Sequence, residues 1–301
     1  MIEFQQLNDR GLILLHRPDF NYFNTGMCSE LGAQLTSCAT MGLKGLVIGT
    51  RLRHWSVGAD IDEHFPGPDN VERMLPAFHS LIRRIATFPI PIIAAINGAV
   101  MGGGYEVARA CRWVVAIDPD HTKIALPEIT LACFPPFGVA TLLHITDDPD
   151  VRRQILRFIM LGHVLKCKEP DDLRLIKDAG LIDDVSVASL NEFASGFNFD
   201  LLNNIPNVSD RCNNPLDVTV GWIQGVLADD GEALRSLSRH ALLTTCDALG
   251  AAAAASNFND ALSTAETEYL NRIVPHPDYT EGLTAAGRGR IPVWKASGFP
   301  G

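Results

Sequence analysis

The stretch "NGAVMGGGYEVARA", residues 97–110, places three consecutive glycines (102–104) directly before a helical pattern that contains Glu106. Glycine costs backbone entropy, so a run of glycines marks a place where another group approaches the main chain closely. A tight turn or a close helix contact is the simplest interpretation. A dinucleotide-binding loop fits badly, because its third glycine position is Val107 and no acidic residue ends a second strand about 20 positions later. A P-loop is excluded because no G-K-[ST] follows.

A helix that begins within Gly103–Glu106 accounts for more of this stretch. The first turn of a helix presents unpaired N–H groups and the positive end of the helix dipole. Without Cβ atoms at residues 102–104, a substrate carbonyl can reach those N–H groups. The stretch therefore predicts an oxyanion hole for an enolate or a tetrahedral oxyanion, with Glu106 beside the activated carbonyl.

Two further segments supply groups that such a site needs. "HWSVGADIDE" (54–63) contains a second glycine loop, Gly58-Ala59-Asp60, which offers another backbone donor. "KIALPEITLACFPPFG" (123–138) places Glu128 directly after a proline. Two carboxylates on separate loops beside a polarised thioester make an acid–base pair. The simpler alternatives are a glutamate that only complements the helix dipole at Glu106 and a surface turn residue at Glu128.

The composition is that of an ordinary globular protein, with 47% hydrophobic and 20% charged residues. The formal charge of −10 argues against nucleic acid or an anionic membrane as the main partner, although a small anionic ligand is compatible with it. We see no signal peptide and no apolar run long enough to cross a membrane. Seven scattered cysteines without a C-x-x-C indicate reduced thiols, so we expect a cytoplasmic protein. The histidines show no metal-ligand spacing.

Short apolar runs alternate with helical patterns in the N-terminal half, which indicates an α/β domain. The predicted strands cover residues 11–16, 43–50, 91–98 and 113–118. A helical pattern that begins at Val71 ends before Pro89. From about residue 190 the chain is rich in Asn, Ser and Pro, and it then shows helical patterns over 217–250 and 258–274.

Several segments, in order and at family spacing, carry a resemblance to a known family. They are "RPDFNYFN" (17–24), "WSVGADIDE" (55–63), "IPIIAAINGAVMGGGYEVARAC" (90–111), "ALPEITLACFPPFG" (125–138), "GLIDDV" (180–185) and "HPDYTEGLTAAGRGRIPVWK" (276–295). Together they resemble the enoyl-CoA hydratase/isomerase (crotonase) superfamily. The resemblance covers residues 8–185 well and the tail in part.

The resemblance implies a crotonase-like ββα spiral core (1–190) with an acyl-CoA site, formed by two roughly perpendicular sheets. It also implies a C-terminal α-helical oligomerisation region (191–301) that builds trimers or acts as a lid, and hence a homotrimer or a dimer of trimers. The implied activity is a lyase of fatty acid metabolism that adds water across the 2,3 double bond of an acyl-CoA or acyl-carrier thioester. Coenzyme A is then part of the substrate, and neither a metal nor a redox cofactor is needed.

Other chemistry of the superfamily remains open: double-bond isomerisation, retro-aldol cleavage, decarboxylation or thioester hydrolysis. A non-catalytic scaffold is a further alternative.

Residue by residue, the resemblance assigns the oxyanion hole to the N–H groups of Ala59 and Gly103. It assigns water activation to Glu106 and protonation of Cα to Glu128. Lys295 matches a tail lysine that contacts the CoA phosphates of a neighbouring subunit. The predicted substrate- and CoA-binding residues are Arg17, Ser56, Gly58, Asp60, Ile61, Gly102 and Lys295.

The sequence also departs from the family pattern. Asp62 stands where the family often has a basic residue, which removes one phosphate contact that Arg17, Arg51 or Arg53 would have to replace. The usual P-G-x-G-G loop reads "PPFGVA" (135–140), so the acyl pocket should differ from that of simple straight-chain hydratases.

Overall fold

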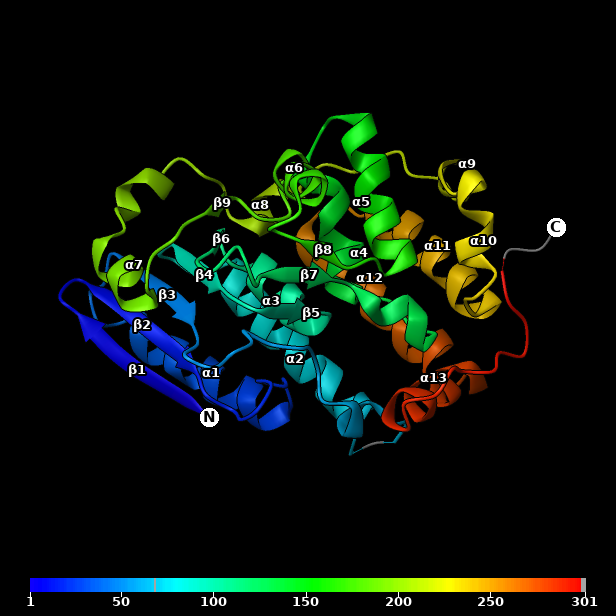
Figure 1. Ribbon diagram of the computed structural model, residues 1–301, viewed down its shortest axis with the longest axis horizontal. Helices are drawn as coiled ribbons and strands as arrows, with labels where there is room; N and C mark the ends of the chain where they lie inside the picture. Colours follow the sequence, from blue (N-terminus) through cyan, green and yellow to red (C-terminus); the bar gives the residue numbers. More distant parts are fainter. Residues whose placement is uncertain (68, 299–301) are drawn as a thin grey trace. The chain divides into compact units, whose positions relative to one another are not determined.

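The computed structural model describes residues 1–67 and 69–298 (Figure 1). The chain divides into two compact units, each assembled from three stretches. The first unit comprises residues 1–60, 77–125 and 164–209, and the second comprises residues 61–76, 126–163 and 210–301. The functional boundary expected between residues 190 and 191 is a different division, and it stays a prediction.

All strands of the described residues lie in the first unit, and six of them form its large sheet. In spatial order they are β1 (Ile2–Leu7), β2 (Arg10–Leu15), β3 (Gly45–Gly49), β4 (Ile92–Ile96), β6 (Trp113–Ala116) and β9 (Asp184–Val185). β1 and β2 form an antiparallel hairpin, and the other neighbours are parallel. The four strands predicted from apolar runs are confirmed as β2, β3, β4 and β6, because strands covered on both faces need continuous apolar sequences.

A second, three-stranded sheet consists of β5 (Ala99–Met101), β7 (Lys123–Ala125) and β8 (Leu165–Lys166). The chain passes from β4 into β5 through Asn97-Gly98. Gly98 has φ +59°, and a Cβ there would overlap the carbonyl oxygen of Arg53. Each passage from the large sheet to the small one is followed by a helix, as in β4–β5–α3, where α3 spans Gly103–Ala110. The expected ββα spiral is therefore confirmed.

One face of the large sheet is covered by the segment after residue 190. Helix α7 (Leu190–Gly196) and the 3-10 helix η4 (Phe199–Leu202) place Leu190 and Phe199 against apolar side chains of β2, β3, β4 and β6. Figure 1 shows α7 beside β2 and β3. Two strand glycines make room for these side chains, since a Cβ at Gly45 would overlap the Phe199 ring and one at Gly49 would lie 2.5 Å from Leu190 Cδ1.

Helix α2 (Val71–Ala86) confirms the predicted helix and accommodates Pro76 within it. It contains the boundary between the two units. The remaining helices of the first unit are α1 (Thr25–Cys38) and α6 (Pro170–Asp178), and α8 (Val208–Arg211) lies at its end.

The second unit is built from helices around an aromatic core. Phe134 and Tyr269 lie 5.3 Å apart between ring centroids, and Tyr269 donates a hydrogen bond to Tyr279 (3.2 Å). The predicted C-terminal helices are confirmed in shorter pieces, of which α11 (Arg239–Ala253) and α12 (Phe258–Glu268) begin at the N-caps Ser238 and Asn257. The helices are α4 (Pro136–Thr141), α5 (Pro149–Leu161), α9 (Val220–Val226), α10 (Gly231–Leu234), α11 (Arg239–Ala253), α12 (Phe258–Glu268) and α13 (Pro277–Gly287).

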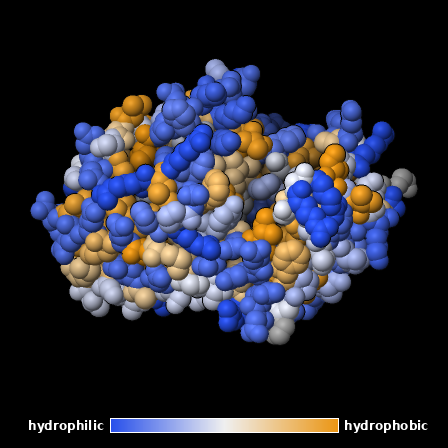
Figure 2. Space-filling view, turned by 60° about the horizontal axis from the view of Figure 1, so that its bottom comes forward, coloured by the Kyte–Doolittle hydropathy of each residue, from blue (hydrophilic) through white to orange (hydrophobic). Residues whose placement is uncertain are grey.

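Hydrophilic residues cover most of the face drawn in Figure 2, and hydrophobic residues lie between them in smaller groups. Among the described residues, none of the helices is both long and apolar enough to span a bilayer.

Candidate active site

The three glycines at the start of α3 are required for three different reasons. Gly102 has φ +50° and ψ −131°, a backbone conformation that side chains with a Cβ rarely adopt. A Cβ on Gly103 would lie 3.2 Å from Phe78 Cζ and 3.5 Å from the backbone nitrogen of Ala59. A Cβ on Gly104 would lie 2.7 Å from both Cβ and Oγ of Ser56. The run therefore brings the start of α3 directly against the loop that contains Ser56 and Ala59.

Two backbone amides lie side by side at this contact. The loop that contains Ala59 pairs with Phe23: the carbonyl of Gly58 accepts from Phe23 N–H (2.9 Å), and the N–H of Asp60 donates to the carbonyl of Phe23 (2.8 Å). The N–H of Ala59 takes no part in this pairing. Gly103 is the first residue of α3, where a helix has no internal acceptor for its N–H groups. Within the described part of the chain, neither Ala59 N–H nor Gly103 N–H donates a hydrogen bond. Two adjacent amide donors of this kind are what an oxyanion hole requires.

The loop from Ser56 to Asp60 is held in place by its own backbone and by a buried serine. Ser56 bridges Val100 of β5, and its Oγ donates to the carbonyl of Asn21 (2.7 Å) while it accepts from Gly58 N–H (3.1 Å). Gly58 has φ +108°, and a Cβ there would lie 3.0 Å from the carbonyl oxygen of Met101. Ser56 and Gly58 thus fix the loop on which Ala59 sits. Their contact with CoA stays a prediction.

Asn21 is a supporting residue that the sequence analysis missed. It is fully buried with φ +51°, and its amide nitrogen donates to Thr50 Oγ1 (3.0 Å) and to the carbonyl of His54 (3.1 Å). These bonds join the loop after β2 to the loop after β3. An asparagine in a turn is ordinary in a sequence, so only the folded chain reveals this role.

The side chain of Arg17 binds two groups of the first unit. Its guanidinium forms an ion pair with Asp60 Oδ2 (2.7 Å) and donates to the carbonyl of Tyr22 (2.8 Å). The predicted CoA-binding residues Arg17 and Asp60 therefore contact each other. A phosphate contact by Arg17 stays a prediction, and it would have to share the guanidinium with this carboxylate.

Glu106 lies in the first turn of α3, three residues after Gly103 and hence on the same side of the helix. Its side chain is buried, with 3% exposure. The helix is anchored by Tyr105, whose hydroxyl donates to the carbonyl of Leu181 (2.9 Å), and by the buried Arg109–Asp183 ion pair (2.9 Å). Burial is the main reason why the pKa of Tyr105 is raised, so this residue stays protonated and acts as a fixed donor.

The other predicted site residues belong to the second unit. Glu128 is half-buried in the 3-10 helix η2 (Pro127–Leu131), which ends in the left-handed residue Ala132 (φ +59°). A Cβ on Gly282 of α13 would overlap the backbone of Leu131, so η2 packs tightly against that helix.

Ile61 and Lys295 also lie in the second unit. Ile61 is half-buried in η1 (Ile61–His64), where the carbonyl of His64 accepts a hydrogen bond from Tyr279 (2.7 Å). Lys295 has an exposed side chain, and its N–H donates to Asp278 Oδ1 (3.0 Å).

No cluster of His, Cys, Asp and Glu within residues 1–67 and 69–298 is suited to hold a metal ion. All seven cysteines are buried free thiols. Burial raises the pKa of Cys167 to about 11 and that of Cys212 to about 12, so these thiols are poor nucleophiles at neutral pH.

Comparisons with known proteins agree with this geometry. A family model for enoyl-CoA hydratase/isomerase matches residues 10–157. A probable enoyl-CoA hydratase of Bacillus subtilis (strain 168) is 33% identical over 170 residues, which are 55% of this chain and 64% of that protein. A cyclohexa-1,5-dienecarbonyl-CoA hydratase of Thauera aromatica is 36% identical over 126 residues, or 40% and 46% of the two chains. The chain thus matches less than two thirds of the length of these curated relatives.

The fold is shared over almost the whole chain. A crystal structure of an enoyl-CoA hydratase from Rhodobacter sphaeroides 2.4.1 superposes with a TM-score of 0.74 at 22% identity, covering 98% of this chain and 92% of that one. The two sheets, the spiral order and the glycine-lined amide pair define a protein of the crotonase fold. Over residues 10–157 the chain is similar to the enoyl-CoA hydratase/isomerase family, and it shares its fold with a solved enoyl-CoA hydratase.

Proposed function

We propose that this protein is an enoyl-CoA hydratase-like lyase that adds water across the 2,3 double bond of an acyl-CoA or acyl-carrier thioester. The observation that carries the proposal is the pair of neighbouring backbone amides at Ala59 and Gly103, which donate no hydrogen bond within the described part of the chain. Fixed donors aimed at a developing oxyanion typically contribute about 3 kcal/mol each to transition-state stabilisation.

In the proposed reaction, the thioester carbonyl accepts hydrogen bonds from both amides. Withdrawal of electron density toward this oxygen makes Cβ electrophilic, and the negative charge that develops after attack is held as an enolate. Glu106 and Glu128 hold the attacking water. Glu106 removes a proton from the water as the new C–O bond forms, and Glu128 delivers a proton to Cα. One water is consumed, and the step leaves Glu106 protonated and Glu128 ionised, so a proton passes from Glu106 to Glu128 before the next turnover.

Glu106 and Glu128 act as a pair in this mechanism, because both hold the same water. Glu106 is already buried, which favours proton exchange with substrate over exchange with bulk water. The recruitment of Glu128 from the second unit to the same substrate is part of the proposal.

The remaining predicted residues act in binding. The adenine and pantetheine parts of CoA are held by main-chain groups of Ser56, Gly58, Asp60, Ile61 and Gly102. Arg17 and the Lys295 of a neighbouring subunit contact its phosphates. We propose a homotrimer or a dimer of trimers that works in the cytoplasm without a metal or redox cofactor. The name of the Thauera aromatica relative, a hydratase of an acyl-CoA, supports this choice of reaction and substrate class.

Product analysis on crotonyl-CoA and on substituted enoyl-CoA thioesters tests the proposal. We expect a 3-hydroxyacyl-CoA as the product, formed at an undiminished rate after treatment with EDTA. A shifted double bond would instead indicate an isomerase. A cleaved carbon chain would indicate retro-aldol or decarboxylase chemistry, and release of free CoA would indicate a thioester hydrolase. Binding of the thioester without turnover would indicate a scaffold.

A further inference from the structure

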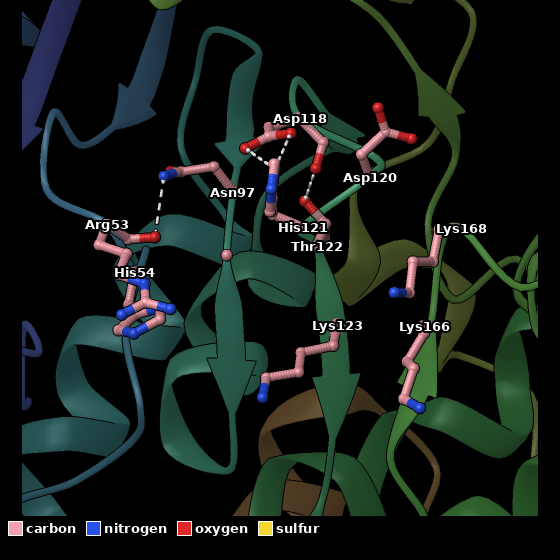
Figure 3. Close-up of a pocket in the computed structure, with 11 residues that line it drawn as sticks. Arg53, His54, Asn97, Asp118, Asp120, His121, Thr122, Lys123, Lys166 and Lys168 are labelled. Carbon is pink, nitrogen blue, oxygen red and sulfur yellow. Dashed lines mark hydrogen bonds and ion pairs between the residues drawn. The ribbon is translucent and has the colours of Figure 1, made fainter.

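A cationic cavity lies in the first unit at the junction of the two sheets. Its volume is about 580 Å³, and it is lined by residues that follow β3, β4 and β6 and by residues of β7 and β8 (Figure 3). Gly98, at the start of β5, is part of its wall, whereas Gly102 follows the end of that strand. The cavity and the amide pair therefore lie toward opposite ends of β5.

The strand register places like charges opposite each other in this cavity. Lys123 of β7 pairs with Lys166 of β8 in an antiparallel ladder, so their side chains leave the sheet on the same face. The ladder continues through a hydrogen bond from Cys167 N–H to the carbonyl of Thr122 (3.0 Å). Lys168 lies in the turn that follows β8, and it also lines the cavity. Directly opposed like charges destabilise a sheet unless a counter-charge lies between them.

The cations of the cavity differ from most others in the chain. Arg17, Arg109 and Arg157 each form an ion pair of 2.9 Å or less with an aspartate. In contrast, the side chains of four residues that line the cavity form neither an ion pair nor a hydrogen bond with the described residues: Arg53, Lys123, Lys166 and Lys168.

The acidic groups of the cavity do not neutralise these four cations. Two carboxylates, Asp118 and Asp120, also line it. Asp118 is bound by His121 Nδ1 at 2.9 Å, as Figure 3 shows. An excess of positive charge is therefore left in a chain whose total formal charge is −10.

His54 adds a neutral donor to the wall. Its Nδ1 accepts a hydrogen bond from Ala99 N–H (3.1 Å), so the hydrogen of the ring is carried by Nε2. Burial and the nearby Arg53 and Lys123 lower the pKa of His54, which keeps this tautomer neutral. The wall thus offers N–H donors and positive charge together, the combination that recognises phosphate oxygens.

We propose that this cavity binds a phosphorylated small molecule, whose phosphate groups lie among Lys123, Lys166, Lys168 and Arg53. The volume exceeds that of a single phosphate ion and falls in the range of sites for small-molecule ligands. The phosphates have two possible sources: the phosphate end of a CoA thioester bound at the amide pair, or a separate phosphorylated ligand.

Isothermal titration calorimetry of the full chain with inorganic pyrophosphate at low ionic strength tests the site. We expect saturable binding that weakens at least about tenfold in the Lys123→Gln/Lys166→Gln double variant, because two charged contacts are removed. Lys177→Gln is the matched control, since Lys177 is an exposed lysine of α6 in the same unit but outside the cavity. Without ligand, the double variant should melt no lower than the wild type, since a like-charge pair has been removed.

The proposal is overturned if pyrophosphate shows no saturable binding. It is also overturned if the double variant melts as expected and still binds pyrophosphate with the affinity of the wild type. Competition identifies the source. If CoA displaces pyrophosphate, and the double variant raises KM for crotonyl-CoA but not for crotonyl-pantetheine, the site receives the phosphate end of the thioester. If pyrophosphate stays bound at saturating CoA, the ligand is a separate one. The calorimetry involves no turnover, so a failure of the proposed hydratase activity would not affect this test.

Discussion

At the scale of single residues, the glycine run at the start of α3 has two structural effects. Gly102 supplies a backbone conformation, while Gly103 and Gly104 supply space for the loop that carries Ser56 and Ala59. A side chain at Gly104 would meet Ser56, which is itself fixed by hydrogen bonds to Asn21 and Gly58. Neither partner has room to give way, so the contact between helix and loop depends on the absence of a Cβ.

We therefore expect Gly104→Ala to lower the free energy of unfolding by about 1–3 kcal/mol, the usual effect of overpacking a core. Urea denaturation of both proteins measures the change. Gly32→Ala is the control, because a Cβ at Gly32 in α1 meets nothing within 4 Å and alanine favours the helix. Equal stabilities of the two variants would show that the loop and the helix are not in the close contact described here.

At the scale of elements, α7 and η4 act as a cover for the large sheet. Phe199 packs on the backbone of Gly45, and Leu190 packs on that of Gly49. Strand glycines lack a side chain to pack, and here the aromatic and aliphatic side chains of the cover fill that space. The stretch after residue 190 therefore completes the core of the first unit before the chain enters the helices of the second.

This packing predicts a specific coupling. Phe199→Ala should lower the free energy of unfolding by about 3–5 kcal/mol, as for other buried aromatic side chains. Gly45→Ala should destabilise the wild type, where the new Cβ overlaps the ring, but have little effect in the Phe199→Ala background. Chemical denaturation of the four proteins gives the coupling energy. Additive effects would mean that Phe199 does not lie over Gly45.

Many of the helices and strands could be predicted from the sequence, and those that could not be predicted were hidden for physical reasons. β2, β3, β4 and β6 are apolar runs of four to six residues, long enough to carry a signal. The strands of the second sheet and β9 span only two or three residues, which is too short for any periodicity. The stretch 190–210 reads as irregular because its apolar residues are spaced by Asn, Ser and Pro, although α7 and η4 form there once the sheet covers them.

The candidate site also contains residues that could be predicted from the sequence and residues that could not. The glycines and the glutamates could be selected from the sequence, because their residue types are unusual in that order. The contacts of Asn21 and Phe78 could not be predicted, since both residues are ordinary in their local sequence and gain importance only through contacts with distant segments. The Arg17–Asp60 ion pair likewise joins residues 43 positions apart.

At the scale of the whole molecule, the proposed reaction depends on both compact units and on neighbouring subunits. Glu106 and the amide pair belong to the first unit, while Glu128 and Lys295 belong to the second. Sedimentation equilibrium should give three or six times the chain mass of 32.8 kDa. Lys295→Gln should raise KM for crotonyl-CoA several-fold and leave KM for crotonyl-pantetheine unchanged. A monomer with full activity would contradict the role assigned to the neighbouring subunit.

In the proposed mechanism, two main-chain amides activate a CoA thioester while two glutamates move protons to and from it. Steady-state hydration of crotonyl-CoA by Glu106→Gln and by Glu128→Gln tests this mechanism most directly, alongside thermal melting and substrate-analogue binding as controls. We predict that each variant folds and binds like the wild type but turns over at least about 10²-fold more slowly, the scale of a lost general acid or base. Wild-type rates in both variants would contradict the account.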